Sequence, residues 1–369
     1  MNARSTQRRS SRFRAALLLI ALTLLLAEVT ARVLVATQWT DDKIEGLTRL
    51  LPARGRYASD PSLPYVLAPG LTALDRNTNS RGWRGPEFDA AKRPGVTRIV
   101  CIGASTTYGW DVLWEHTWPA RLQAMLSEGD DEFEVLNAGV PGYVSTEVVE
   151  HFQRHVLPTD PDVVVFYGGR NDVFPQGYNR YSADYTHYRR RDYSIEQANS
   201  AHKRLFAVSH LAMVLCTWRG DRFGWSSINH NPVHGSLRRE NRPTPEEFTR
   251  NIGERGRGDT FTAQLNHLTE LCAARGAELV LVQIPVRPDM LATGSLDHDD
   301  RFKAPFGEQV TRNNAAVRRV AELHGLPLID ATALTQDADL FMDDCHMTAD
   351  GHYRFAQLAA RAILAARDR

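Results

Sequence analysis

Residues 97–102 read T-R-I-V-C-I and run directly into Gly103-Ala104-Ser105-Thr106-Thr107-Tyr108-Gly109. The run is short and rich in β-branched residues, which is typical of a buried strand in a parallel sheet. The small and hydroxylated residues after it predict a tight turn into a helix. Open parallel sheets place their sites at the carboxyl ends of strands, so this turn is a candidate for chemistry.

The alternation of strand and helix patterns continues along the chain. Further short apolar runs predict strands at residues 133–136, 162–167, 278–284 and 327–329. Amphipathic stretches predict helices at 117–127, 146–156, 260–275, 307–324 and 349–366. This order implies parallel strand–helix–strand units with right-handed crossovers, and therefore an α/β fold around a sheet of about five strands.

Composition excludes several classes of protein. The chain has 369 residues, of which 43% are hydrophobic and 24% charged, so neither wholesale disorder nor a multi-span transporter is expected. Its 44 basic and 44 acidic residues leave no formal net charge, and no nucleic-acid partner is expected. Four cysteines without a C-x-x-C pair predict neither a disulfide framework nor a zinc ribbon.

The N-terminus has the charge pattern of a targeting segment. Five arginines precede the first acidic residue: Arg4, Arg8, Arg9, Arg12 and Arg14. An apolar run from about residue 15 to 36 follows, interrupted by Glu28 and Arg32. A signal anchor that spans a bilayer and a signal peptide cleaved near residues 29–31 both fit. In either case the basic flank stays in the cytoplasm and the rest of the chain is exported.

The expected organisation has three parts. Residues 1–37 form a basic tip and membrane helix, residues 38–95 an extended lead-in, and residues 96–369 the α/β domain. Within that domain, residues 173–259 are an insertion rich in tyrosine and arginine. We interpret the insertion as either a lid or substrate platform, or a solvated surface addition.

Polar blocks follow three of the strands. Ser105 follows the first, Asn137-Ala138-Gly139-Val140-Pro141-Gly142 the second, and Gly168-Gly169-Arg170-Asn171-Asp172 the third. A serine at a strand end is a possible nucleophile, a glycine admits close approach of a ligand, and an asparagine amide can donate to an oxyanion. Taken singly, each block is also compatible with an ordinary turn.

A fourth block near the C-terminus contains Asp343-Asp344-Cys345-His346. The spacing of Asp343 and His346 allows the carboxylate to accept from one imidazole nitrogen while the other faces a nucleophile. Asp344 is the rival acid, but its spacing is one residue short. Cys345 either modulates the base or packs, and His352 is expected to be a packed or surface histidine.

Together, the order of the four blocks resembles the SGNH hydrolases, also called GDSL esterases and lipases, of the bacterial membrane-anchored type. The matching segments are G-A-S-T-T-Y-G, N-A-G-V-P-G, G-R-N-D and D-D-C-H, and the lead-in N-S-R-G-W-R-G adds to the likeness. Ala104 stands where the family often has an aspartate. The resemblance covers residues 98–369 apart from the insertion.

The resemblance implies a three-layer α/β/α, flavodoxin-like sandwich and a serine hydrolase mechanism. It implies Ser105, His346 and Asp343 as the catalytic residues. The oxyanion donors would be the backbone N–H groups of Ser105 and Gly142 and the amide of Asn171. Arg170 is a candidate substrate contact, with a surface ion pair as the alternative. No metal or organic cofactor is expected.

Three functions remain open from the sequence. The first is an esterase that removes acyl groups, acetyl among them, from an envelope or extracellular carbohydrate or lipid. The second is an O-acyltransferase that uses the same residues to modify a cell-envelope polysaccharide. The third is a non-catalytic envelope binding protein, against which the complete set of site residues argues. The expected location is the bacterial inner membrane, with the domain on the exported side, or outside the cell after cleavage.

Overall fold

The computed structural model describes residues 3–38, 56–71, 77–129, 132–191, 208–215, 233, 236–254, 257–291 and 299–367. The chain divides into two compact units. The N-terminal unit comprises Met1–Gly55 and Tyr193–Gly235, and the α/β unit comprises Arg56–Asp192 and Ser236–Arg369.

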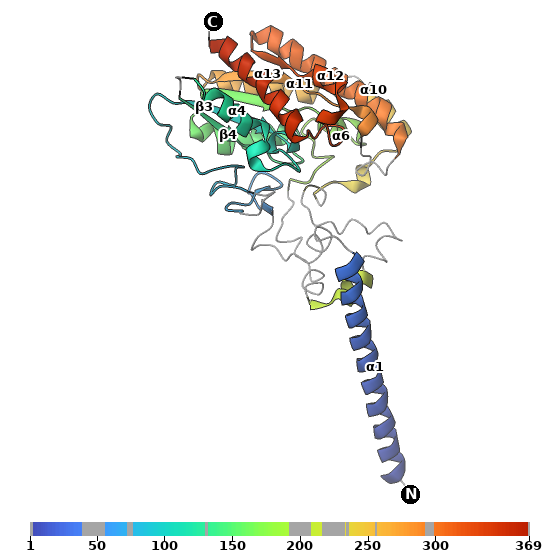
Figure 1. Ribbon diagram of the computed structural model, residues 1–369. Helices are drawn as coiled ribbons and strands as arrows, with labels where there is room; N and C mark the ends of the chain where they lie inside the picture. The colour runs from blue at the N-terminus through green and yellow to red at the C-terminus, as the bar shows by residue number, and fades with distance from the viewer. Residues whose placement is uncertain are drawn as a thin grey trace. The chain divides into compact units, whose positions relative to one another are not determined.

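The N-terminal unit contains the helix α1 (Ala3–Gln38), shown in blue in Figure 1. Within it, Phe13–Gln38 is long and apolar enough to cross a membrane. Its leucines are largely exposed, as expected for a helix that faces lipid rather than a protein core. The prediction of an N-terminal apolar helix is confirmed.

The α/β unit is built on a parallel sheet with the strand order β4-β3-β5-β6-β7. The strands are β3 (Thr97–Gly103), β4 (Phe133–Asn137), β5 (Val163–Tyr167), β6 (Glu278–Gln283) and β7 (Leu328–Asp330). Val100 of β3 pairs with Leu136 of β4 and with Val164 of β5, so the first strand lies inside the sheet. The predicted five-stranded parallel sheet is confirmed.

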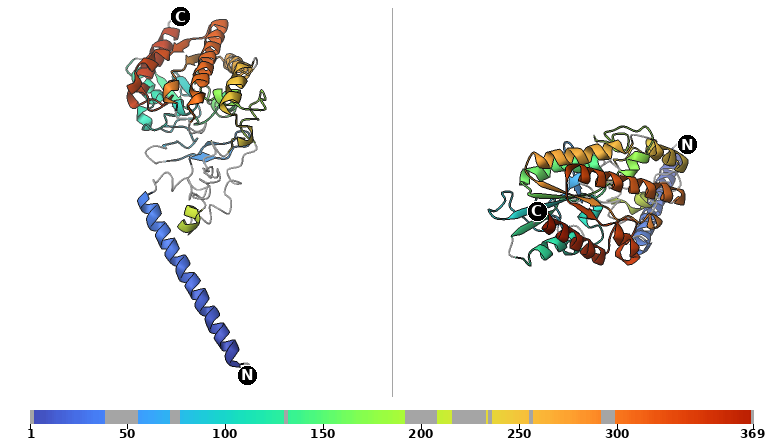
Figure 2. Two further views of the ribbon diagram at one scale, coloured as in Figure 1. Left: turned by 90° about the vertical axis from the view of Figure 1, so that its right-hand side faces the viewer. Right: turned by 90° about the horizontal axis from the view of Figure 1, so that it is seen from above.

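Helices cover both faces of this sheet, as the view from above in Figure 2 shows. One face carries α4 (Trp118–Leu126) and α13 (Ala349–Arg367), which pack against each other. The other carries α5 (Ser145–His151), α11 (Asp259–Ala273) and α12 (Lys303–His324). The structure is thus a three-layer α/β/α arrangement, with apolar side chains buried on both faces of the strands.

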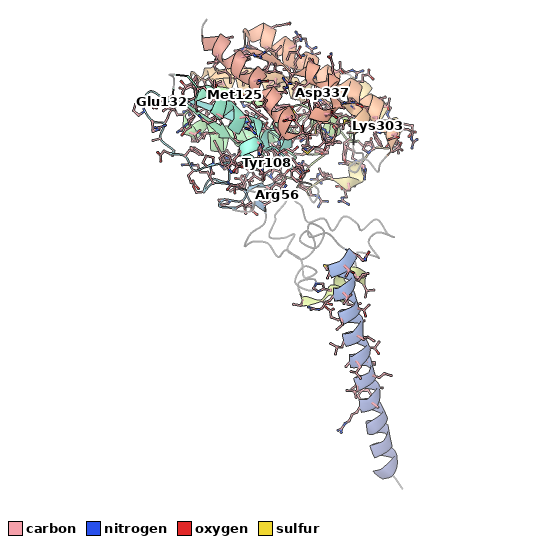
Figure 3. The ribbon with its side chains drawn as sticks, in the orientation of Figure 1. Arg56, Tyr108, Met125, Glu132, Lys303 and Asp337 are labelled. Carbon is pink, nitrogen blue, oxygen red and sulfur yellow. The ribbon has the colours of Figure 1, made fainter. Side chains whose placement is uncertain are left out.

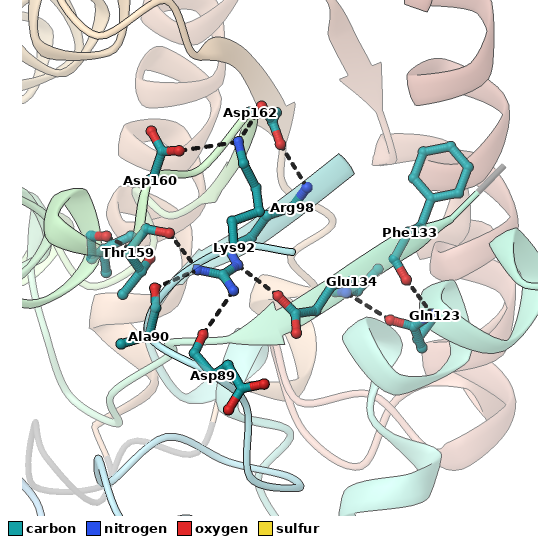
Figure 4. A network of polar contacts seen from close by, with 12 residues as sticks. Asp89, Ala90, Lys92, Arg98, Gln123, Phe133, Glu134, Thr159, Asp160 and Asp162 are labelled. Carbon is teal, nitrogen blue, oxygen red and sulfur yellow. Dashed lines mark hydrogen bonds and ion pairs between the residues drawn. The ribbon is translucent and has the colours of Figure 1, made fainter. Parts of the chain in front are cut away.

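Arg98 is a charged residue inside the buried strand β3, with only 1% of its surface exposed. Its guanidinium donates to the carbonyl oxygens of Asp89, Ala90 and Thr159 and forms an ion pair with Glu134 at 2.6 Å (Figure 4). Each of the three guanidinium nitrogens thereby has at least one acceptor, which is what makes burial of the charge tolerable. This network lies at the amino end of the strand, opposite to the polar turn that follows Gly103.

The described part of the lead-in folds onto the α/β unit. It contains the antiparallel pair β1 (Tyr57–Ala58) and β2 (Val66–Leu67). The guanidinium carbon of Arg56 lies 4.2 Å from the ring centre of Trp110, and Figure 3 shows Arg56 beside Tyr108. Arg84 is buried and donates to three carbonyl oxygens at and after the end of α3, those of Tyr108, Gly109 and Val112.

The described parts of the predicted insertion also belong largely to the α/β unit. The helix α6 (Val173–Gly177) follows β5, and α10 (Pro245–Gly253) packs against it. Thr244 caps α10 by accepting from the backbone of Glu247, whose carboxylate accepts from Thr244 in return. Tyrosines of this region are buried in the core: Tyr178, Tyr185 and Tyr188.

Candidate active site

Ser105 lies at the start of the short helix α3 (Ser105–Tyr108), directly after the carboxyl end of β3. Gly139 packs against this turn so closely that a Cβ on it would lie 2.4 Å from the backbone nitrogen of Tyr108. The side-chain amide of Asn137 donates to the carbonyl oxygen of Thr107 at 2.9 Å. The second block therefore supports the turn that presents Ser105.

The structure brings Ser105, His346 and Asp343 into one line of hydrogen bonds. The Nε2 atom of His346 lies 2.7 Å from Oγ of Ser105, and its Nδ1 atom lies 2.6 Å from Oδ2 of Asp343. The other carboxylate oxygen accepts from the backbone N–H groups of Cys345 and His346. Because an ionised carboxylate can only accept, the proton of the neutral imidazole lies on Nδ1, and in that form Nε2 accepts from the serine hydroxyl.

The charges of this pair reinforce each other. Burial alone would favour the neutral carboxyl, but the hydrogen bond and charge of His346 hold the pKa of Asp343 well below its ordinary value. Burial likewise favours the neutral imidazole, yet the neighbouring Cys345 and the hydrogen bond and charge of Asp343 raise the pKa of His346. This arrangement stabilises an imidazolium once His346 has accepted a proton.

Asn171 lies beside Ser105, and both line the same pocket. Its Nδ2 atom donates to the carbonyl oxygen of Tyr143 at 2.9 Å, while Arg170 approaches its Oδ1 atom at 3.3 Å. These two contacts fix the orientation of the amide. Gly142 adopts a φ of 83°, a left-handed conformation that favours glycine and turns its backbone relative to the preceding residue.

The loop of residues 141–145 is held from several directions. Arg189 donates to the carbonyl oxygen of Gly142 at 2.7 Å and forms a buried ion pair with Glu147, also at 2.7 Å. The carboxylate of Glu147 accepts from the backbone of Val144. Asp172 accepts from the backbone and the hydroxyl of Ser145. The segment that would supply one oxyanion donor is thus fixed by side chains on both sides.

Asp172 is a buried acid within this frame. Burial raises its pKa to about 7, although its hydrogen bonds with Ser145 act in the opposite direction. Its contacts tie the third block to the start of α5. Sequence reasoning passed over Asp172, although it directly follows Asn171 in the G-R-N-D segment.

Arg170 contacts Asp344, the second acid of the C-terminal block. Its Nε and Nη2 atoms donate to the two carboxylate oxygens at 2.9 Å each, and the Asp344 side chain is 2% exposed. The guanidinium also lies over the rings of Phe174 and Phe306. Asp344 therefore pairs with Arg170 while Asp343 pairs with His346.

The other two residues of this region are packed. Cys345 is 2% exposed, with its sulfur 3.8 Å from Nδ1 of His346, and burial raises the pKa of its thiol. His352 is buried, and its Nδ1 atom accepts from the backbone of Trp118 at the start of α4. Burial lowers the pKa of His352 to about 3, so it is neutral at physiological pH.

A small pocket of about 20 Å³ opens beside Ser105. Among the described residues, Cys345 is the one member of the C-terminal block that lines it, and Asn171 lies on its wall. The remaining lining is mainly apolar: Val144, Val148, Phe166, Ile284 and Val286. A cavity of roughly 10–15 Å³ holds one water molecule, so the space admits a group of only a few atoms.

The same region contains a set of donor atoms of the kind that bind metal ions. Ligand atoms of Asp343, Cys345 and His346 lie within 4.8 Å of one another. Two of them, however, already share the 2.6 Å hydrogen bond between the carboxylate and Nδ1. A metal ion there would have to replace that bond, so the geometry favours the carboxylate–imidazole pair.

The structure thus combines an α/β/α sandwich with a line of hydrogen bonds from Ser105 through His346 to Asp343. The chain belongs to the GDSL-like lipase/acylhydrolase family, whose model matches residues 101–354. It is therefore a hydrolase that acts on ester bonds, and the predicted family is confirmed. No curated protein sequence matches it.

Solved structures of related fold show low sequence identity. A lipase/acylhydrolase from Enterococcus faecalis is 18% identical, with a TM-score of 0.41 over 72% of this chain and 95% of that one. The acetylxylan esterase Axe2 from Geobacillus stearothermophilus is 15% identical, with a TM-score of 0.40 over 73% and 92%.

Proposed function

We propose that the chain is a serine esterase that hydrolyses acyl esters of an envelope or extracellular carbohydrate or lipid through an acyl-enzyme on Ser105. The observation that carries this proposal is the 2.7 Å contact between Oγ of Ser105 and Nε2 of His346, with Asp343 on the opposite ring nitrogen. A nucleophile, a base and an acid that orients the base are the parts that acyl transfer requires.

In the proposed reaction, Oγ of Ser105 attacks the ester carbonyl while Nε2 of His346 accepts the hydroxyl proton. The carbonyl oxygen becomes an anion that the backbone N–H groups of Ser105 and Gly142 and the amide of Asn171 stabilise. His346 then returns the proton to the departing alcohol, and the C–O bond of the ester breaks. Water repeats the sequence on the acyl-enzyme and releases the acid.

The size of the pocket supports a small acyl group, such as acetyl. The departing alcohol must lie next to His346, because that residue protonates it. The acyl part then points to the side of Asn171, where the apolar pocket of about 20 Å³ lies.

For location, we propose that the apolar helix is retained as an anchor in the bacterial inner membrane with the α/β unit exported. The five arginines before the apolar run support this orientation. A fusion reporter placed after Lys43 should be active only outside the cytoplasm, and cytoplasmic activity would contradict export.

The catalytic proposal is tested with a fluorophosphonate probe and a short-chain aryl ester. Labelling should map to Ser105, and Ser105→Ala should abolish both labelling and turnover while leaving the thermal transition nearly unchanged. The exposed serine Ser80 supplies a matched control, since Ser80→Ala should behave as wild type. Full activity in Ser105→Ala would remove Ser105 as the nucleophile. Product analysis with and without an acceptor glycan then distinguishes hydrolysis from transfer.

A further inference from the structure

Glu28 is an acidic residue within the apolar helix α1. It lies fourteen positions beyond Arg14, the last of the N-terminal arginines, which corresponds to roughly 21 Å along a helix. A bilayer core of about 30 Å that begins near Arg14 would therefore place Glu28 inside its outer half. An acid at that depth requires partners, and it marks a functional contact by default.

The partners of Glu28 come from residues 208–215 of the same unit. Its Oε2 atom accepts from the hydroxyl of Ser209 at 2.8 Å and from the backbone of Leu211 at 3.0 Å. Its Oε1 atom accepts from the backbone of His210 at 2.9 Å and from Nε of Arg32 at 3.0 Å. The carboxylate of Glu28 thus binds the guanidinium of Arg32 on its own helix and also the backbone of residues that are distant in the sequence.

The segment is otherwise suited to an apolar environment. It reads V-S-H-L-A-M-V-L, residues 210–215 are helical, and the backbone N–H of Met213 donates to the carbonyl oxygen of Ser209. The hydroxyl of Ser209 accepts from the backbone of Ala212, and Nη2 of Arg32 approaches the carbonyl oxygen of Val208 at 3.4 Å. The hydroxyl of Ser209 and the first backbone N–H groups of the segment are therefore paired within the protein, and Nδ1 of His210 lies 3.7 Å from the Glu28 carboxylate.

Some apolar side chains of this unit are buried, and others are exposed. Met213 is fully buried, and Ala31 and Val35 of α1 are 5% and 2% exposed. By contrast, Val208 and Leu215 are 68% and 53% exposed, although both are apolar. Val208 and Leu215 are thus exposed apolar side chains on a segment that contacts the apolar helix α1. Such a surface is suited to contact with lipid.

We infer that residues 208–215 form a second membrane-embedded element, which docks onto α1 at Glu28 and faces lipid with Val208 and Leu215. This inference rests on the retained anchor of the proposed function, because cleavage near residues 29–31 would separate Glu28 from Arg32. The partner that binds Glu28 on α1 is thus residues 208–215 of the same chain. Residues 208–215 would thereby give the chain a second point of contact with the bilayer.

The test uses the full-length protein in vesicles of phosphatidylethanolamine and phosphatidylglycerol that contain nitroxide-labelled lipid. Cys216→Ser first removes one cysteine, and Leu215→Cys then introduces the site for a bimane label. The described cysteines, Cys101, Cys272 and Cys345, are buried and therefore protected from labelling. Leu323→Cys, on α12 and 75% exposed, is the reference position in the α/β unit. Lipid quenching at position 215 should exceed that at position 323 several-fold.

The role of Glu28 is tested in the same assay. Glu28→Ala should lower quenching at position 215 to the level of position 323. The matched control is Thr30→Ala on the same helix, because Oγ1 of Thr30 bonds only to Leu26 within α1 in the described structure, and it should leave quenching unchanged.

Three results would overturn the inference. One is equal quenching at positions 215 and 323 in vesicle-bound protein, and another is undiminished quenching in Glu28→Ala. Recovery of the protein outside the vesicles would overturn it together with the retained anchor. Hydrolysis of an aryl ester by the same samples reports on the catalytic proposal alone.

Discussion

Arg170 and Asp344 form a bidentate ion pair, with both contacts at 2.9 Å, that joins two loops of the candidate active site. Arg170 directly precedes Asn171, and Asp344 directly follows Asp343. The pair therefore connects the proposed oxyanion donor to the proposed base and its orienting acid. Because Asp344 is almost fully buried, removal of either partner leaves the other charge unpaired in the protein interior.

We expect Arg170→Met to lower the free energy of unfolding by about 3–5 kcal/mol, because it leaves the Asp344 carboxylate buried and unpaired. The double variant Arg170→Met/Asp344→Leu should recover much of that loss. Urea unfolding measures both. Arg154→Met breaks an exposed ion pair with Glu150 and should cost less than about 1 kcal/mol. A similar loss in Arg154→Met and Arg170→Met would contradict the importance of burial.

Asn171→Ala should lower kcat by about 10²- to 10³-fold with little change in KM, since an oxyanion donor acts mainly in the transition state. Steady-state hydrolysis of an aryl acetate provides the measurement. Asn266, whose side chain contacts His324 away from the site, offers a control that should retain full activity as Asn266→Ala. A change confined to KM would argue for a ground-state role instead.

Arg189 is expected to act as a positioning residue, because its guanidinium holds the carbonyl oxygen of Gly142 rather than the substrate. Displacement of that loop in Arg189→Met should reduce kcat by about 10- to 100-fold. Arg189→Lys keeps the charge and should restore part of the activity, whereas KM should change little in both. Unaltered kcat in a folded Arg189→Met would exclude this role.

The pH dependence of kcat/KM should show an acidic limb above the ordinary imidazole pKa of 6.5, because the pKa of His346 is raised and only its neutral form can accept the serine proton. Asp343→Asn removes the anion on Nδ1, so the limb should move to lower pH while kcat falls by about 10³- to 10⁴-fold. A limb that stays in place would show that Asp343 does not control the titration.

Asp172 predicts a pH dependence of stability. Its folded pKa is about 7 against an ordinary value of 3.8, so the folded state binds this proton more tightly. The free energy of unfolding should therefore fall by a few kcal/mol as the pH rises between these values. Asp172→Asn keeps an acceptor for Ser145 and should flatten that slope in urea unfolding. Asp300→Asn, at an exposed position, should keep the wild-type slope.

The sheet and the polar blocks could be predicted because their signals are local. Each short apolar run is a strand, and parallel strands bring their carboxyl ends to one edge, which places Ser105 near Asn171. The spacing of Asp343 and His346 likewise lies within one loop. Each of these predictions depends on residues that are close in the sequence.

The support of the site could not be predicted because it depends on distant contacts. Arg189 and Gly142 are 47 positions apart, and no periodic pattern links them. Tyrosines of the insertion suggested a polar platform, yet Tyr178, Tyr185 and Tyr188 are buried among apolar residues. The hydroxyl group makes tyrosine look like a surface residue in a sequence, whereas its ring packs readily in a core.

The contacts of Arg84 bear on how a soluble form of this enzyme should be produced. Arg84 lies before the first strand of the sheet, yet its guanidinium closes the turn that follows α3 through the carbonyl oxygens of Tyr108, Gly109 and Val112. A recombinant fragment limited to residues 101–354, the matched family region, would lack Arg84 and its contacts with the turn after α3. An expression boundary just before Arg56 removes the apolar helix α1 and keeps Arg84 with its three contacts.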